Sequence, residues 1–125
     1  MVKSILIADD NALIRQGLCE LFSREADFEV CGEAENGREA IEEAQELQPD
    51  LILLDLSMPV MNGLDAARAL TRLMPEVPVI MYSAYVDSFT PREARSAGVS
   101  ALVSKSENIA VLLGKARSLV YEIAA

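Results

Sequence analysis

One segment decides the fold of this 125-residue chain: PDLILLDLSMP, residues 49–59. At its centre, residues 51–54 are four aliphatic residues in a row without polar alternation, which is typical of a parallel strand covered on both faces. Asp55 follows at once, and the segment then runs into a loop that contains Pro59. The segment therefore predicts a buried central strand that ends in a carboxylate.

The rest of the chain alternates short apolar runs with segments of helical spacing. The further runs are residues 5–8, 30–31 (a weak signal), 77–82 and 101–103. The helical stripes consist of Leu13, Ile14, Leu18, Leu21 and Phe22; of Ile41, Ala44 and Leu47; of Leu64, Ala67, Leu70 and Met74; and of Ile109, Leu112, Leu113, Ala116 and Val120. Strands that alternate with helices predict right-handed crossovers, and so an α/β fold with one parallel sheet between two layers of helices.

Composition limits what the chain can do. Eleven Lys and Arg residues against twenty Asp and Glu, with no His, give a formal net charge of −9. That charge argues against direct binding to nucleic acid or to a membrane surface. The missing His excludes serine-hydrolase triads and most catalytic zinc sites. Cys19 and Cys31 are too few for a disulfide scaffold, so we expect a reduced, cytoplasmic protein in which residues 1–125 form one domain.

Polar side chains stand where the predicted strands end. Asp9 and Asp10 follow the first strand, Asp55 follows the third, the fourth delivers Ser83, and the fifth runs into Lys105. In an open α/β sheet, ligands bind outside the carboxyl ends of the strands. Three carboxylates at one site repel each other unless a cation neutralises them, and a hard divalent ion such as Mg²⁺ suits oxygen ligands. With a lysine and a hydroxyl nearby, the pattern predicts a phosphoryl-transfer site.

Each of these residues alone is better explained as a turn former, a helix cap or a solvated loop residue. Their joint placement at one edge of the predicted sheet is what favours a site. A metal, a lysine and a hydroxyl around one carboxylate make a site in which positioning and electrostatics can promote phosphoryl transfer.

Over essentially its whole length the sequence resembles the receiver domain of bacterial two-component response regulators. The resemblance is carried by Leu6-Ile7-Ala8-Asp9-Asp10-Asn11, by residues 49–59, by Met61-Asn62-Gly63, by Ser83-Ala84, by Ala97-Gly98 and by Lys105. Residues 13–18, LIRQGL, are similar to the receivers of transcription regulators of the LuxR/NarL type. The resemblance implies a flavodoxin-like (βα)5 fold, a doubly wound parallel sheet with strand order 2-1-3-4-5 in a three-layer αβα arrangement.

The resemblance also implies a metal site for Mg²⁺. Asp10, Asp55 and the backbone carbonyl of Ser57 would hold the ion, and Asp9 would contribute through water. Asp55 would be the phosphoacceptor, taking a phosphoryl group from a sensor histidine kinase or a phosphotransfer protein.

Further residues would respond to the phosphoryl group. Lys105 would pair with it, Ser83 would move towards it, and the backbone N–H of Ala84 would add a donor. The added charge would shift a two-state equilibrium and so change a surface made by the fourth helix, the fifth strand and the fifth helix. The resemblance thus implies a signalling switch rather than a conventional enzyme, with a homodimer formed on phosphorylation as a candidate assembly.

Three departures from the family pattern concern this switch. Leu102 stands where the family usually has Tyr or Phe, and Ser106 stands where Pro commonly follows the lysine; Ser106 is a candidate N-cap of the fifth helix. Thr90-Pro91-Arg92-Glu93 fits a late helix start with proline at its first position. We therefore predict a short fourth helix, from about Pro91 to Ala97, after a loop over residues 85–89, and a usual dimer face that is moved or weakened.

Other readings of the acidic pattern remain. A haloacid-dehalogenase-type phosphohydrolase would need a second Asp two residues after the nucleophile, where this chain has Ser57. A flavodoxin would need a phosphate loop where Asp9 and Asp10 would repel the phosphate. The more serious rival is an atypical receiver, a protein-interaction module whose output is independent of phosphorylation.

Overall fold

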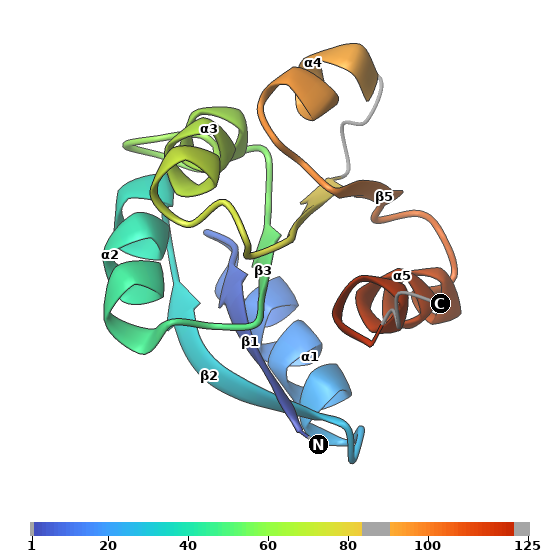
Figure 1. The fold of residues 1–125 in the computed structure, drawn as a ribbon. Helices are drawn as coiled ribbons and strands as arrows, with labels where there is room; N and C mark the ends of the chain where they lie inside the picture. The colour runs from blue at the N-terminus through green and yellow to red at the C-terminus, as the bar shows by residue number, and fades with distance from the viewer. Residues whose placement is uncertain (1, 84–90, 122–125) are drawn as a thin grey trace.

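The computed structural model describes residues 2–83 and 91–121. Its strands are β1 (Lys3–Ala8), β2 (Phe28–Ala34), β3 (Leu51–Leu54), β4 (Val79–Ser83) and β5 (Ala101–Ser104). Its helices are α1 (Ala12–Ser23), α2 (Gly37–Leu47), α3 (Gly63–Leu73), α4 (Pro91–Ser96) and α5 (Ile109–Val120). The strands form one parallel sheet in the order β2-β1-β3-β4-β5 (Figure 1), so the expected flavodoxin-like topology is confirmed.

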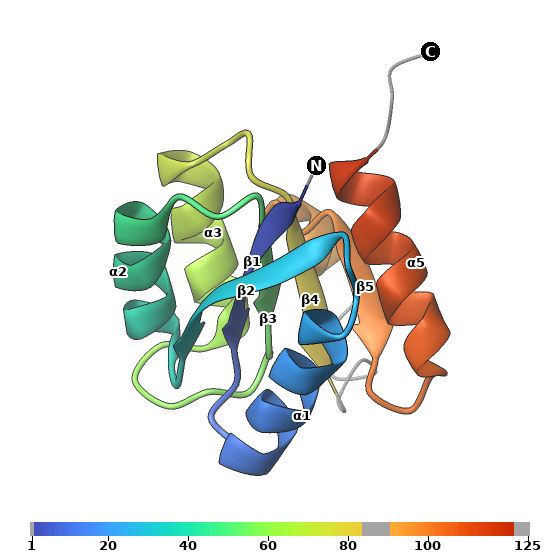
Figure 2. The ribbon, with the colours of Figure 1, turned by 90° about the horizontal axis from the view of Figure 1, so that it is seen from below.

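Alternate residues of each central strand enter different cores. Ile52 and Leu54 of β3 point into the core that α2, α3 and α4 cover, whereas Leu51 and Leu53 point into the core that α1 and α5 cover. Figure 2 shows α2 and α3 on one side of the sheet and α1 and α5 on the other. Because both faces are covered, β3 carries no polar residue, and all four of its residues are buried.

Only the second strand is much longer than its sequence signal. β2 spans seven residues, whereas the apolar run predicted only residues 30–31. It is an edge strand, and only its ends, Phe28 and Ala34, are fully buried. A strand of this kind needs few apolar side chains, so periodicity marks it weakly.

Parallel pairing brings the ends of β1 and β3 to the same level. Ala8 pairs with Leu54, and the backbone N–H of Asp55 donates to the carbonyl of Ala8 over 2.9 Å. On the other side of β1, the N–H of Asp9 donates to the carbonyl of Ala34 over 3.0 Å. The ladder therefore continues one residue beyond the strand ends, and both acids start from fixed backbone positions.

Four of the five helices begin at an asparagine whose side chain accepts from the first turn, namely Asn11, Asn36, Asn62 and Asn108. At the start of α2, the side-chain Oδ1 of Asn36 accepts from the N–H of Glu39 over 2.8 Å. Ser106 is not the N-cap of α5. Asn108 takes that place because its side chain accepts from the N–H of Ala110, while the hydroxyl of Ser106 bonds the hydroxyl of Ser104.

The fourth helix is short, as expected. It spans Pro91–Ser96, which is within one residue of the predicted end. Gly98 follows with φ +91°, a left-handed conformation that ends helices and favours glycine. The predicted loop over residues 85–89 lies outside the described residues.

The opposite edge of the sheet, where the strands begin, is closed by a group that we call the closing cluster: Glu25, Asp27, Arg117 and Tyr121. Arg117 of α5 donates from Nε to Asp27 Oδ2 over 2.8 Å and also bonds Glu25. The Tyr121 hydroxyl donates to the carbonyl of Asp27. The cluster ties the last helix to the start of β2.

Among residues 2–83 and 91–121, no helix is both long and apolar enough to cross a membrane.

Candidate functional site

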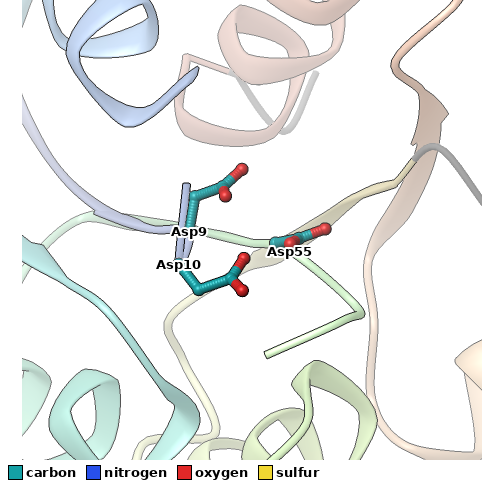
Figure 3. Close-up of side chains that lie close together, drawn as sticks. All are labelled: Asp9, Asp10 and Asp55. Atoms are coloured by element: carbon teal, nitrogen blue, oxygen red, sulfur yellow. The ribbon is translucent and has the colours of Figure 1, made fainter. Parts of the chain in front are cut away.

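The predicted acids converge at the carboxyl-terminal edge of the sheet. Asp9 and Asp10 follow β1 and Asp55 follows β3, and one oxygen of each carboxylate lies within 4.8 Å of the others. Figure 3 shows all three side chains reaching into one space from these two strand ends. Residues 45 or more positions apart in the chain are therefore assembled by the strand order alone.

Asp9 is buried, and both of its carboxylate oxygens already have protein partners. Oδ1 accepts from the backbone N–H of Asn11 over 2.9 Å, and Oδ2 accepts from Lys105 Nζ over 3.0 Å. Asp10, in contrast, is exposed. The geometry therefore leaves Asp10 and Asp55 as the carboxylates best able to contact a bound ion directly, with Asp9 behind them.

Asp55 is the second buried carboxylate of the site. Its relative exposure is 6%. Burial raises the pKa of its carboxyl group above the usual range, and the neighbouring charge of Asp9 raises it further. Lys105, whose Nζ lies 3.3 Å from Asp55 Oδ1, offsets part of that rise. The negative charge of ionised Asp55 is thus only partly compensated by Lys105, and a bound cation would compensate more of it.

Lys105 contacts both buried acids from the other side of the site. Burial lowers the pKa of its ammonium group, but the hydrogen bond to Asp9 and the charge of Asp55 outweigh that effect, so the net shift is upward. Its backbone is fixed as well, because its N–H donates to the carbonyl of Ser83 over 2.9 Å. Nζ also lies 5.8 Å from the centre of the Tyr82 ring. Lys105 is therefore a charged, anchored group next to the Asp55 carboxylate.

The loop after β3 passes close to the backbone of Asp55. The N–H of Gly63 donates to the carbonyl of Leu56 over 2.8 Å, and a Cβ at position 63 would lie 2.1 Å from the carbonyl oxygen of Asp55. Only glycine fits this approach. Val60, at the tip of the loop, has φ +68°, and the loop leaves Ser57 exposed beside the site.

The site is a surface depression with a volume of about 260 Å³. It is lined by Asp9, Asp10, Asn11, Ile14, Asp55, Ser57 and Lys105. Three carboxylates against one ammonium leave negative charge uncompensated, and the donors are all hard oxygen atoms. This donor set fits Mg²⁺, which takes one or two carboxylates and keeps several waters.

The structure describes two of the three residues that the resemblance connects with a switch. Ser83 is fully buried at the end of β4, level with Ser104 on β5. Ala84 lies outside the described residues, so its expected N–H donor is not described. Leu102 is partly buried against the core that α2, α3 and α4 cover, where it supplies aliphatic packing in place of a ring.

Two residues at this edge lie in the motifs that carry the resemblance but had no predicted role of their own. Asn11 caps α1 and at the same time donates to Asp9. Arg15 of α1 donates from Nη1 to the carbonyl of Asp9 over 2.8 Å. An Asn directly after the acid pair is a recognisable cap signal. Nothing in the sequence indicates that Arg15 folds back to the strand end.

Comparison with known proteins identifies the family that the sequence resembles. Residues 5–117 match the family model of the response regulator receiver domain. The chain is 40% identical over 105 residues to the chemotaxis protein CheY of Thermotoga maritima, covering 84% of this chain and 87% of that protein. It is 39% identical over 105 residues to the transcriptional regulatory protein LnrK of Bacillus subtilis, covering 84% of this chain but only 47% of LnrK. The chain thus spans about half the length of LnrK.

The structural comparison agrees. The response regulator domain of Thermotoga maritima CheB superposes with a TM-score of 0.89 at 29% sequence identity, covering 98% of this chain and 99% of that one.

Proposed function

This chain belongs to the response regulator receiver family, and from that premise we propose that it accepts a phosphoryl group on Asp55 from a histidine kinase or a phosphotransfer protein. Receiver domains act in two-component signal transduction and are not conventional enzymes. The observation that carries the assignment to Asp55 is its position: a buried carboxylate 3.3 Å from Lys105, beside the exposed carboxylate of Asp10. We propose further that residues 1–125 form one receiver domain.

In the proposed reaction, an oxygen of Asp55 attacks the phosphorus atom in line with the departing nitrogen of phosphohistidine. A P–O bond forms while the P–N bond breaks, and the electron pair leaves on the nitrogen, which takes a proton from water. Lys105 pairs with a phosphoryl oxygen, so that its charge stays close to where negative charge develops. Ser83 and Ala84 are proposed to donate to the phosphoryl oxygens once the acyl phosphate has formed.

When bound, Mg²⁺ supplies positive charge that offsets the charge of the acids and of the phosphoryl oxygens. Asp10, Asp55 and the carbonyl of Ser57 would hold it, and Asp9 would act through water. The protein prepares this site by bringing the three carboxylates within 4.8 Å, where their mutual repulsion favours a divalent ion.

The proposed output is a change of surface. Phosphorylation adds a charge of about −1.5 to −2 at the end of β3, and the response would reach the face made by α4, β5 and α5. A phosphorylation-dependent homodimer through that face is a candidate. The free thiols Cys19 and Cys31 suit the reducing cytoplasm, where we propose that the protein works. The comparisons do not favour the alternative of a phosphorylation-independent module.

The test is intact-mass spectrometry after incubation with Mg²⁺ and phosphoramidate. We expect one phosphoryl adduct on the parent protein, none without Mg²⁺, and none on Asp55→Asn. Asp27→Asn is the matched control, because it makes the same change in the closing cluster and should be phosphorylated normally. Absence of an adduct on folded parent protein, or an adduct on Asp55→Asn, would contradict the proposal.

A further inference from the structure

Asp9 and Asp10 are adjacent in the chain, yet their carboxylates meet at one site. In an extended strand, successive side chains point to opposite faces. Here both side chains extend towards Asp55 (Figure 3), with an oxygen of each within 4.8 Å of the others. The chain leaves β1 at Ala8 and bends at Asp10, so the peptide that joins the two acids must be held in a turned orientation.

Arg15 holds the carbonyl of that peptide. Its Nη1 donates to the carbonyl oxygen of Asp9 over 2.8 Å, although Arg15 belongs to the first turns of α1. The Arg15 side chain is only 11% exposed, since it lies between α1 and the end of β2. Its Nε donates to Glu33 Oε1 over 2.9 Å, and its Nη2 lies 3.7 Å from Glu35 Oε1. The planar guanidinium is therefore fixed from two sides.

The backbone of Asp9 is thus held at both ends. Its N–H donates to the carbonyl of Ala34, and its carbonyl accepts from Arg15. With both groups bonded, the plane of the peptide between Asp9 and Asp10 is restrained, and this restrains the positions of the N and Cα atoms from which the Asp10 side chain extends. Asp10 is exposed, so packing against buried neighbours does not restrain its side chain.

We propose that Arg15 is a positioning residue for the divalent-cation site: it orients the Asp9–Asp10 peptide so that the Asp10 carboxylate is ready to bind the ion. The inference rests on the metal dependence given under Proposed function. Arg15 acts through the backbone of Asp9 and does not touch the ion itself. Residues that orient metal ligands in this way typically change metal affinity 10–100-fold when they are lost.

The charge of Arg15 has the opposite effect on the ion from its geometry. A guanidinium next to the acids repels a divalent cation, although Glu33 and Glu35 offset that repulsion. Replacing Arg15 by a neutral residue would therefore strengthen Mg²⁺ binding if charge were all that mattered. It would weaken binding if the orientation of Asp10 matters more. The sign of the change separates the two effects.

The experiment is isothermal titration calorimetry, which measures the Kd for Mg²⁺ of the unphosphorylated protein. It is done at a temperature where circular dichroism shows that each variant is folded. For Arg15→Met we expect a roughly tenfold rise in Kd. Arg24→Met, which removes a charge from the exposed end of the same helix, should bind within about twofold of the parent. Arg15→Lys keeps the charge but loses the fork, and should recover part of the affinity, to within about threefold of the parent.

A second measurement separates positioning from a general loss of structure. In Mg²⁺-dependent phosphorylation by phosphoramidate, Arg15→Met should need more Mg²⁺ for half-maximal rate but approach the parental rate at saturation. If Arg15→Met does not fold, Arg15→Lys decides alone, because its charge is unchanged and weaker binding then reports geometry.

Unchanged or tighter Mg²⁺ binding by folded Arg15→Met, or parental binding by Arg15→Lys when Arg15→Met does not fold, overturns the role of Arg15 and leaves the metal site standing. A parent protein that binds no Mg²⁺ overturns the metal site itself, and this inference with it.

Discussion

The carboxyl-terminal edge of the sheet and the opposite edge, where the strands begin, each carry an aspartate beside a basic side chain. The pKa values of these two aspartates are shifted in opposite directions. At the carboxyl-terminal edge, burial and the charge of Asp9 raise the pKa of Asp55. At the other edge, the hydrogen bond from Arg117 lowers the pKa of Asp27. Both aspartates contact a cation, Lys105 in one case and Arg117 in the other. What differs is the surroundings, because Asp55 is buried among other acids whereas Asp27 is partly exposed.

The comparison shows how the surroundings of two aspartates change the energetic cost of ionising them. For Asp27, ionisation is favourable in the folded protein, so the group helps to hold α5 to the start of β2. For Asp55, ionisation is costly, so the folded state is stabilised when a bound cation compensates the charge. Ionised Asp55 therefore carries an energetic cost at the carboxyl-terminal edge, whereas ionised Asp27 helps to hold the opposite edge together.

The largest expected effect comes from removing the ammonium group of Lys105, which lies beside the proposed acceptor Asp55. Lys105→Met leaves Asp9 and Asp55 without the ammonium that lies 3.0 and 3.3 Å from them. We expect phosphorylation by phosphoramidate to slow at least about 100-fold, the usual cost of losing one preorganised charged donor. Lys115→Met, an exposed change on α5, is the control and should react at the parental rate. If Lys105→Met were phosphorylated as fast as Lys115→Met, Lys105 would balance the charges of Asp9 and Asp55 without assisting phosphoryl transfer.

The second prediction concerns the backbone beside the acceptor. Gly63→Ala places a Cβ 2.1 Å from the carbonyl oxygen of Asp55, and the backbone must shift. We expect a loss of about 1–3 kcal/mol of unfolding free energy by urea denaturation. Gly17→Ala is the matched control, since nothing lies within 4 Å of its Cβ in α1, and it should stabilise by about 0.5–1 kcal/mol. Equal effects would show that the loop yields freely and that Asp55 is not held by it.

The third prediction tests the contrast between the two aspartates directly. At pH 7, Asp55→Asn should raise the unfolding free energy by about 1 kcal/mol, because it removes a buried charge that is poorly compensated. Asp27→Asn should lower it by about 0.5 kcal/mol, a small effect because the Asp27 and Arg117 side chains are 34% and 40% exposed and screened by solvent. Changes of the same sign would contradict the comparison.

The smallest effect is the pH dependence of those differences. The raised pKa of Asp55 means that its contribution falls as pH rises above about 4, so the advantage of Asp55→Asn should shrink when pH is lowered towards 4. The lowered pKa of Asp27 means that its contribution persists down to about pH 4 and is lost below it. Denaturant titrations between pH 3 and pH 7 should therefore show the two effects vanishing in that order. The reverse order would count against the assigned shifts.

Sequence alone predicted the parts of the fold that depend on burial from both sides. β3 was evident because residues 51–54 must be apolar on both faces, and the position of Asp55 followed from the end of that run. The convergence of Asp9, Asp10 and Lys105 followed from topology, since parallel strands end at one edge. β2 was underestimated because an edge strand has looser requirements.

The remaining features depend on contacts between distant residues. Arg15 and Glu33 are 18 positions apart, and Arg117 and Asp27 are 90 apart, so no local pattern announces either pair. The cap of α5 was misassigned for a related reason. Ser106 and Asn108 are both good N-caps, and only the hydrogen bond between Ser106 and Ser104 decides that Asn108 begins the helix.

The backbone bond from Asp55 to Ala8 has a consequence for insertions and deletions. The two acids emerge together because residues 5–8 and 51–54 are paired in one register. Losing a single codon inside either run would turn the acid to the other face of the sheet. Adding several residues to a surface connection, such as the one between α3 and β4, costs little and leaves that register alone. Variants with altered length should therefore keep a complete acidic site when the change falls in a connection that carries no site residue, such as the one between α3 and β4, and lose it when the change falls inside β1 or β3.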